Sequence, residues 1–426
     1  MGGSIDLSVI IPALREGPNL ALLLPLLRGV LNRLGIPYEI LVITREPDVQ
    51  TREVTAQFSA KLVEQTAPGY GGALLTGFAN ASGAYWLTMD ADLSHQPDFI
   101  AKLWGEKEKA EVSIASRYVK GGTASMPALR FVMSRTLNFF FSRGLDLPFR
   151  DMSSGFRLYK STALRGETYA ARNFAILQEI LVRGYAQGWK IQEIPFHYAP
   201  RQLGKSKAQL IGFAWDYLKA LWSLWRLRNS IESADYDSRA YDSIIFIQRY
   251  WQRSRFRHIT QLIAGEGRVL DVGCGSSRII GALPPGSVAL DILLRKLRFA
   301  RKYSKHVVQG TGFALPFPDA SFPCVLSSQM IEHVPKEPQV LDELCRVLAP
   351  GGRLILGTPD YANWEWVITE KIYEKVVPGG YAHEHISHYT RRELIDTFEK
   401  RGFKLEDTRY ILKGELILAF RKPRAG

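Results

Sequence analysis

The stretch AYWLTMDADLSHQP, residues 84–97, joins a short apolar run to a turn with two acidic residues. Comparable apolar runs lie on both sides of it: LSVIIP at 7–12, YEILVIT at 38–44 and AEVSIAS at 110–116, with segments of helical period between them. This alternation is typical of an α/β domain with a mainly parallel sheet. We therefore expect functional residues at the carboxyl ends of these strands.

The alternation begins again after a charged, aromatic stretch at residues 229–260. The second set of apolar runs comprises VLDVG (269–273), SVALD (287–291), PCVLSS (323–328) and RLILGTP (353–359). The sequence thus predicts two α/β domains in series, with a first domain over 1–230, a helical linker over 231–260 and a second domain over 261–426.

The composition favours a folded protein with an anionic partner. The chain has 426 residues, 46% of them apolar, and a net charge of +13. Its basic residues gather around phosphate motifs and a tryptophan-rich helix, without a nucleic-acid-reading module, so nucleic acid is not an expected partner.

Cys274, Cys324 and Cys345 form an odd set without metal spacing, and residues 1–14 do not resemble a signal peptide. We expect a cytoplasmic protein.

Asp90 and Asp92 are the strongest chemical signal in the first half. They follow an apolar strand and are two residues apart, so in extended chain both carboxylates project to the same side. Oxygen ligands in this arrangement suit Mg²⁺ or Mn²⁺ bound to a diphosphate. The alternative is a pair of loop acids that cap the next helix.

The surrounding segments favour the metal site. VIIPALREGPNL, DADLSHQP, ASRYVKGG, DMSSGFRLYK, LQEILVRGYAQGWKIQEIPFHY and RQLGKSK follow one another over about 200 residues. Together they resemble the dolichyl-phosphate (polyprenyl-phosphate) mannosyltransferase branch of the family 2 glycosyltransferases. The resemblance implies a GT-A fold that transfers a sugar from a nucleoside diphosphate to an isoprenoid phosphate with inversion. GDP-mannose is the leading donor; UDP-linked sugars remain open because LVITREPD at 41–48 lacks the family's acidic turn and Arg15 replaces an asparagine.

The resemblance also implies roles for individual residues. Pro12 and Glu16 would line the nucleotide pocket, and Asp90 and Asp92 would hold the metal and the donor diphosphate, with Ser94 or His95 completing the metal shell. The positions expected near the acceptor or donor phosphates are Arg117, Arg157, Arg201, Ser206 and Lys207. The residues expected to be catalytic are Asp90, Asp92, Arg117, Asp151, Arg201 and Lys207. Asp151 and Glu179 either orient the acceptor or, as we favour, tether Arg157 or a loop.

The sequence pattern over residues 209–228 predicts a strongly amphipathic helix. Trp215, Leu218, Trp222 and Trp225 share its apolar face, opposite a polar stripe of Asp216, Lys219, Ser223 and Arg226. Central charges make a membrane-spanning position too costly, so we expect the helix to lie in the membrane interface, with Arg226 and Arg228 toward anionic lipid. The alternative is packing against the second domain or a partner. Residues 139–141, three phenylalanines, could cradle the lipid or belong to a core helix.

RVLDVGCGSSR, residues 268–278, places a glycine-rich turn after a strand, and Asp291 ends the next strand twenty residues beyond Asp271. This is how a Rossmann-like domain binds a nucleoside. FALPFPDASF, VLSSQMIEHV and LDELCRVLAPGGRLILGTPD follow, and the set resembles class I S-adenosylmethionine-dependent methyltransferases over about 160 residues. The resemblance places Asp271, Gly273 and Gly275 in the cofactor loop, Asp291 at the ribose, and Leu315 beside the adenine.

Methyl transfer to a hydroxyl needs a base, for which His333, His383 and His385 are candidates, His333 first. The run HEHISHYT could also bind a metal, but no partnering acidic motif accompanies it, so a substrate pocket or a helix cap is the favoured interpretation.

Together these features predict a bifunctional enzyme on the cytosolic face of a membrane. Its first half would make a polyprenyl-phosphate sugar, and its second half would methylate that sugar, the lipid-linked product or a related glycan intermediate. One alternative is direct glycosylation of a glycan or glycolipid. Another is a membrane-bound scaffold in which one domain binds without turnover.

Overall fold

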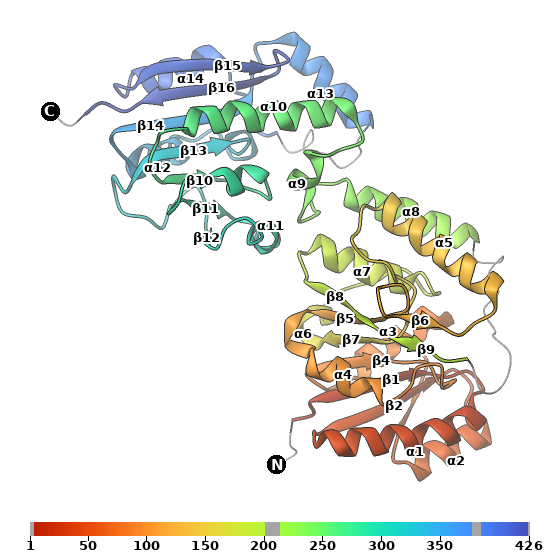
Figure 1. Ribbon diagram of the computed structural model, residues 1–426. Helices are drawn as coiled ribbons and strands as arrows, with labels where there is room; N and C mark the ends of the chain where they lie inside the picture. Colours follow the sequence, from red (N-terminus) through yellow and green to blue (C-terminus); the bar gives the residue numbers. More distant parts are fainter. Residues whose placement is uncertain (1–3, 201–213, 377–384, 425–426) are drawn as a thin grey trace. The chain divides into compact units, whose positions relative to one another are not determined.

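The structure is a computed structural model that describes residues 4–200, 214–376 and 385–424. The chain divides into two compact units (Figure 1). The first unit comprises residues 1–185 and 189–225, and the second comprises residues 186–188 and 226–426. Each unit has its own seven-stranded sheet, as expected for two α/β domains in series.

The first sheet has the strand order β3-β2-β1-β4-β7-β5-β8. Its strands are β1 (Leu7–Pro12), β2 (Tyr38–Thr44), β3 (Lys61–Glu64), β4 (Tyr85–Thr88), β5 (Val112–Ser116), β7 (Arg157–Lys160) and β8 (Ile191–Pro195). Only β7 runs antiparallel to its neighbours, β4 and β5. The residues that precede β7 therefore lie at the same edge of the sheet as those that follow β4 and β5. A short parallel pair, β6 (Thr123–Ala124) and β9 (His197–Tyr198), is separate.

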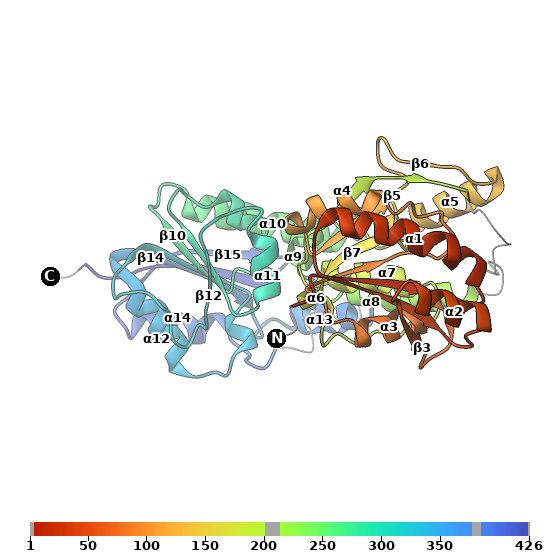
Figure 2. The ribbon, with the colours of Figure 1, turned by 90° about the horizontal axis from the view of Figure 1, so that it is seen from below.

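Helices cover both faces of this sheet (Figure 2). The helices of the unit are α1 (Gly17–Leu34), α2 (Val49–Gln57), α3 (Gly69–Asn80), α4 (Phe99–Gly105), η1 (Lys107–Lys109), α5 (Ala128–Gly144), α6 (Ser161–Leu164), α7 (Ile176–Ala186) and α8 (Ala214–Arg228). Val9 and Ile11 share a buried cluster with α1, whereas Ile10 faces the other way, where a β-carbon on Gly77 of α3 would lie 2.3 Å from it. Because both faces are covered, β1 is a continuous apolar run.

The second sheet has the order β12-β11-β10-β13-β14-β16-β15, and only β16 runs antiparallel to its neighbours. Its strands are β10 (Val269–Val272), β11 (Val288–Asp291), β12 (Val307–Gln309), β13 (Phe322–Ser328), β14 (Leu348–Pro359), β15 (Lys404–Ile411) and β16 (Glu415–Arg421). The helical elements are α9 (Tyr236–Ala240), α10 (Phe246–Ile263), η2 (Arg278–Ala282), α11 (Leu294–Ala300), η3 (Ile331–His333), α12 (Pro338–Val347), α13 (Trp364–Val376) and α14 (Arg391–Glu399).

Most of α10 falls within the predicted linker, but the helix packs into the second unit. Ile259, Leu262 and Ile263 are buried in one cluster with Val269 of β10. Helices α12 and α14 contribute to the cluster on the opposite face, through residues such as Leu344 and Phe398. The segment between the two predicted domains is therefore part of the core of the second one.

The amphipathic helix predicted over 209–228 is described from residue 214 onward, as α8. Trp222 is exposed, and the expected position of this helix in the membrane interface stays a prediction. The prediction that Arg228 faces lipid is wrong: Arg228 is fully buried and donates to both carboxylate oxygens of Asp235, at 2.5 and 2.8 Å. Of the helices described, none combines the length and the apolar character needed to cross a bilayer.

Candidate active sites

Asp90 and Asp92 lie in one turn directly after β4. The Asp90 N–H donates to His95 Nδ1 at 2.9 Å, and the Tyr70 hydroxyl lies 3.4 Å from Asp90 Oδ1. Asp92 Oδ1 accepts from the Ser94 N–H at 3.1 Å and from the Ser94 hydroxyl at 2.5 Å. Asp90 is thus held through its backbone N–H by His95, and Asp92 is held through its carboxylate by Ser94.

His95 and Ser94 hold these two acids through hydrogen bonds that could not be predicted from the sequence. His95 is buried, stacks on Phe156 with ring centroids 4.9 Å apart, and meets Tyr198 edge-on. Burial lowers the pKa of His95, which favours the neutral ring. Since Nδ1 accepts the Asp90 N–H, the ring proton belongs on Nε2, 3.7 Å from Asp90 Oδ2. His95 and Ser94 therefore orient Asp90 and Asp92.

The charges at this turn fit a divalent cation. The Asp90 side chain is 35% exposed, so it is accessible from solvent. Burial and the neighbouring Asp92 raise the pKa of Asp90, against the opposing effect of His95. A cation bound beside Asp90 and Asp92 would offset this effect and favour the ionised form of Asp90.

A close backbone approach borders the same turn. Thr88 of β4 donates its hydroxyl to the Gly155 carbonyl at 2.7 Å. A β-carbon on Gly155 would stand 2.5 Å from the Tyr70 hydroxyl and 3.5 Å from Asp90 Oδ1. Only glycine leaves room for Tyr70 at this position, which explains the glycine of the DMSSGFR segment.

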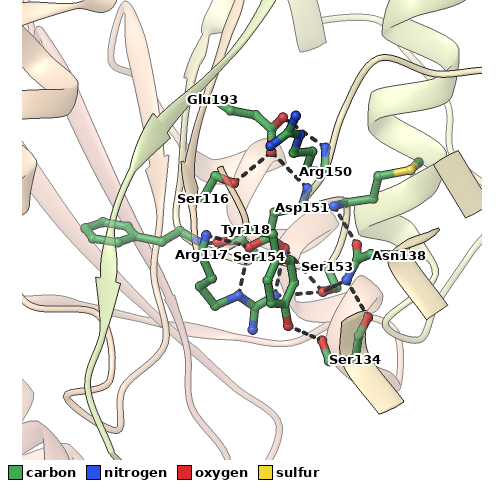
Figure 3. Close-up of polar contacts among 12 residues, drawn as sticks. Ser116, Arg117, Tyr118, Ser134, Asn138, Arg150, Asp151, Ser153, Ser154 and Glu193 are labelled. Atoms are coloured by element: carbon green, nitrogen blue, oxygen red, sulfur yellow. Dashed lines mark hydrogen bonds and ion pairs between the residues drawn. The ribbon is translucent and has the colours of Figure 1, made fainter. Parts of the chain in front are cut away.

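Arg117 follows β5 and is held by Asp151 (Figure 3). Its N–H, Nε and Nη2 donate to the Asp151 carboxylate at 2.9, 2.8 and 2.7 Å, and Nη2 also donates to Ser153 Oγ at 2.7 Å. Asp151 is fully buried and also accepts the Ser154 N–H. Burial alone would raise the pKa of Asp151, but Arg117 lowers it below its usual value. Asp151 therefore positions Arg117, rather than Arg157, and its oxygens are occupied by donors.

Two residues missed by sequence reasoning hold this loop in place (Figure 3). Glu193 of β8 accepts the N–H groups of Arg150 and Asp151 at 2.9 and 2.8 Å and the Ser116 hydroxyl at 2.7 Å. Asn138 of α5 donates to Ser153 Oγ at 2.8 Å and accepts the Met152 N–H at 2.7 Å. Glu193 lies in the quoted QEIPF segment, but nothing in its spacing indicates its partners.

The side chain of Arg157, expected near a phosphate, lies in the core and bonds to backbone carbonyls. Arg157 is fully buried and donates to the carbonyls of Leu177 and Met152 at 2.7 and 2.8 Å, so in this position it supports the backbone. Glu179 accepts the Ala170 and Ala171 N–H groups and pairs with Arg183, in keeping with the favoured tethering of a loop. Arg201, Ser206 and Lys207 lie outside the described residues.

The predicted nucleotide-pocket residues lie at the carboxyl end of β1. Pro12 is the last residue of the strand, and Glu16 precedes α1, where it accepts from Asn19 Nδ2 at 2.5 Å. Between them Arg15 has a positive φ of 55° and forms an exposed ion pair with Glu46. These residues share the sheet edge with Asp90 and Arg117, as expected for parallel strands.

Helix α5 has two contrasting faces. One face turns large apolar side chains to solvent, and its members are Leu129, Val132, Met133, Phe139 and Phe140, which are 42–74% exposed. The other face carries Asn138 and Ser134, and Ser134 accepts the Tyr118 hydroxyl at 2.8 Å. Residues 139–141 are divided between the faces, because Phe141 is buried. An apolar surface helix is thus bonded directly to the Arg117 loop.

The second unit gathers its predicted cofactor residues at the carboxyl ends of β10 and β11. Asp271 is 3% exposed, and burial together with Asp291 raises its pKa to about 7. Asp291 accepts the N–H groups of Gly275 and Leu293, both at 2.8 Å. Gly273 has a φ of 76°, and a β-carbon there would meet the Met330 side chain at 2.5 Å. Two buried acids beside a glycine-rich turn at the carboxyl ends of parallel strands fit a cationic nucleoside ligand.

Asp237 of α9 was not foreseen at this site. Its Oδ2 accepts from the N–H and hydroxyl of Ser276 and from Lys296 Nζ, all at 3.0 Å. Leu315 is buried in the core cluster, with its N–H bonded to Glu343 Oε2 at 2.6 Å. The rings of His333 and His385 lie close together, with centroids 4.9 Å apart, whereas His383 lies outside the described residues.

Two protein-family models match this chain, one in each of the two units. Residues 8–166 match the glycosyl transferase family 2 model, and residues 270–356 match a methyltransferase domain model. The dolichol-phosphate mannosyltransferase of Pyrococcus furiosus is 31% identical over 239 residues, which cover 54% of this chain and 66% of that protein. The polyprenol monophosphomannose synthase of Mycolicibacterium smegmatis is 28% identical over 214 residues, which cover 47% and 79%.

One solved structure that aligns with this chain is an S-adenosylmethionine-dependent methyltransferase of Thermotoga maritima, described as a possible histamine N-methyltransferase. The TM-score is 0.37 and the sequence identity is 24%. The alignment covers 43% of this chain and 96% of that one. The chain thus spans 66% of the length of the Pyrococcus relative and nearly all of the methyltransferase.

Proposed function

The chain joins a family 2 glycosyltransferase domain to a methyltransferase domain, and on that premise we propose that it glycosylates a polyprenyl phosphate and methylates a sugar-containing substrate. The first reaction would use a nucleotide sugar, with GDP-mannose as the leading donor. The second would use S-adenosylmethionine on the sugar, the lipid-linked sugar or a related glycan intermediate. The enzyme would act at the cytosolic face of a membrane.

In the first domain the chemistry depends on positioning. The acceptor phosphate is already ionised at neutral pH, so its oxygen can attack the anomeric carbon as the bond to the nucleoside diphosphate breaks, with inversion. Asp90 and Asp92 would hold Mg²⁺ or Mn²⁺, which stabilises charge on the departing diphosphate. Arg117 offsets the repulsion between the two phosphate groups. Because Asp151 and Ser153 bind its Nε and Nη2, the guanidinium is fixed before substrate arrives.

The observation that carries the choice of a lipid acceptor is the two-faced helix α5. Its exposed face holds five large apolar side chains, a surface suited to burial in the membrane interface. Its inner face is bonded to the loop that fixes Arg117. An acceptor whose tail lies in the membrane and whose phosphate is at the membrane surface matches both faces. A water-soluble glycan acceptor would not explain why these five apolar side chains are exposed.

In the second domain Asp271, Gly273, Gly275 and Asp291 would hold S-adenosylmethionine, which supplies the methyl group. The cofactor carries positive charge, and Asp271 is a buried carboxylate whose pKa of about 7 reflects burial beside a second acid. His333, at the end of η3, would take the proton from a hydroxyl acceptor.

The test is product analysis with the purified full chain. It is incubated with polyprenyl phosphate in vesicles, GDP-mannose or UDP-sugars, and S-adenosylmethionine, and lipids are identified by mass spectrometry. We expect a polyprenyl-phosphate hexose, absent with Asp92→Asn and retained with Asp98→Asn, an exposed acid six residues away. A further mass increase of one methylene unit would report methylation. If no donor yields a prenyl-linked sugar, the glycosyl transfer proposed here is refuted.

A further inference from the structure

A second group of metal-type ligands lies in the methyltransferase domain. Glu332 and His333 follow β13 on η3, and His385 precedes α14. Each offers one ligand atom, and these three atoms lie within 4.8 Å of one another. The acidic member of this group is thus supplied by η3, more than fifty residues upstream of His385.

His385 is already oriented as a ligand. Its Nδ1 lies 2.7 Å from Glu370 Oε1 and 2.9 Å from the Tyr361 hydroxyl, which itself donates to Glu370 at 2.9 Å. A hydrogen bond from Nδ1 to a carboxylate fixes the tautomer in which Nε2 carries the lone pair. Metal-binding histidines are commonly held by a carboxylate in this way.

Glu332 has an oxygen that the protein leaves unsatisfied. The residue is fully buried, and Oε2 accepts the Thr358 hydroxyl at 3.2 Å. Oε1 is buried and has no hydrogen-bond partner among the residues that the structure describes. The Glu332 carbonyl accepts the N–H groups of Ile386 and Ser387 at 2.9 and 3.0 Å, which holds the His385 segment alongside. A buried carboxylate oxygen without a donor is costly unless a ligand satisfies it.

The competing interpretation is a pair of packed histidines that serve only as a pocket wall or a base. That interpretation accounts for the proximity of the rings, but neither for the bare oxygen of Glu332 nor for the carboxylate behind His385. The rings of His333 and His385, with centroids 4.9 Å apart, are close enough to donate one lone pair each to the same cation.

We propose that Glu332, His333 and His385 bind one divalent transition-metal cation, with Glu370 as the positioning residue for His385. Two imidazoles and one carboxylate favour Mn²⁺, Fe²⁺, Co²⁺, Ni²⁺ or Zn²⁺ over Ca²⁺, and three protein ligands leave coordination positions for a substrate. Met330, two residues before Glu332, touches the glycine loop at Gly273. If the proposed methyl transfer is correct, the cation would bind the acceptor oxygen near the cofactor and lower its pKa. It would then replace His333 in the proton-accepting role given above, because a metal-bound imidazole has no lone pair left for a proton.

The test is Co²⁺ titration of the full chain carrying Asp90→Asn and Asp92→Asn, which removes the carboxylates expected to bind metal in the first domain. Visible absorption reports nitrogen-ligated Co²⁺, and dialysis with elemental analysis gives the stoichiometry. We expect one Co²⁺ per chain in this background and its loss on His385→Ala. The matched control is His388→Ala, which removes an exposed histidine three residues away that stacks on Tyr361. Absence of Co²⁺ in the background, or equal binding after His385→Ala, overturns the site.

Glu370→Gln keeps all three ligands and serves if His385→Ala does not fold, as judged by circular dichroism. Loss of the orienting carboxylate is expected to weaken Co²⁺ binding by about 10- to 100-fold. An unchanged affinity would rule out the positioning role of Glu370. Because these measurements require no turnover, they separate failure of the metal site from failure of the proposed methyl transfer.

Discussion

Asp151 in the first unit and Asp271 in the second are both buried carboxylates at the carboxyl-end edge of a sheet, yet they differ in their partners. Asp151 faces Arg117 and several N–H groups, and its pKa is lowered. Asp271 has a second acid, Asp291, beside it, and its pKa is raised to about 7. The first unit therefore compensates this charge with a cationic side chain, whereas in the second unit a neighbouring acid opposes the ionisation of Asp271.

The change expected to have the largest effect is Asp151→Asn. It leaves the Arg117 guanidinium, whose side chain is 10% exposed, without its carboxylate. Breaking a buried ion pair from one side costs about 3–5 kcal/mol. We expect the free energy of unfolding of the first unit to fall by that amount in urea denaturation followed by circular dichroism.

Asp98→Asn is the matched control for this prediction. Asp98 pairs with Arg33 at 2.9 Å, but the two side chains are 84% and 70% exposed. Exposed pairs contribute less than about 1 kcal/mol. Equal losses for the two variants would contradict the claim that Asp151 is the internal counter-charge of the site.

Asp271→Asn tests the second acid of this comparison, through the pH dependence of the free energy of unfolding. The pKa of Asp271 is raised from 3.8 to about 7 in the folded protein, so protonation stabilises the fold below that value, and this contribution is lost as the pH rises through 7. Asparagine has no such dependence. Relative to the unsubstituted ligand-free protein, the variant should gain about 2–3 kcal/mol between pH 5 and pH 8. A pH-independent difference, measured by urea denaturation at both pH values, would show that Asp271 is not an uncompensated acid.

Phe140→Ser is expected to have the smallest effect and extends the comparison to the molecular surface. Phe140 is 62% exposed on α5, and its partial burial in lipid should contribute about 1–2 kcal/mol. We expect sedimentation with anionic vesicles to show roughly tenfold weaker binding. Leu26→Ser on α1, at 56% exposure, is the control and should bind as the unsubstituted chain does. Equal losses would indicate that α5 is not a specific membrane face.

Much of the fold could be predicted from the sequence because buried parallel strands are continuous apolar runs. Each of the eight quoted runs contains or overlaps a strand, from β1 to β14. The antiparallel course of β7 and the packing of α10 into the second unit could not be predicted, since both depend on contacts far along the chain. The same holds for Arg228, whose charged end suggested lipid while its partner Asp235 lies beyond the helix.

The candidate sites divide in a similar way. Asp90, Asp92, Asp271 and Asp291 could be placed because strand ends position them locally. The choice of Arg117 over Arg157 as the partner of Asp151 could not be made, because both arginines stand in quoted motifs and only the tertiary fold separates them. Asp237 and Glu193 act on partners 39 and 42 residues away, for which single-sequence spacing carries no signal.

The missing side chain of Gly155 gives a way to separate the two proposed activities. A methyl group there would compete with the Tyr70 hydroxyl for the same space, one contact away from Asp90. Gly155→Ala would thus disturb the turn that holds Asp90, in the proposed sugar-transfer site, without changing any acidic or basic side chain. Cells that carry this allele would retain an intact methyltransferase half, so that whatever methylated product persisted in them could not depend on sugar transfer by the same molecule.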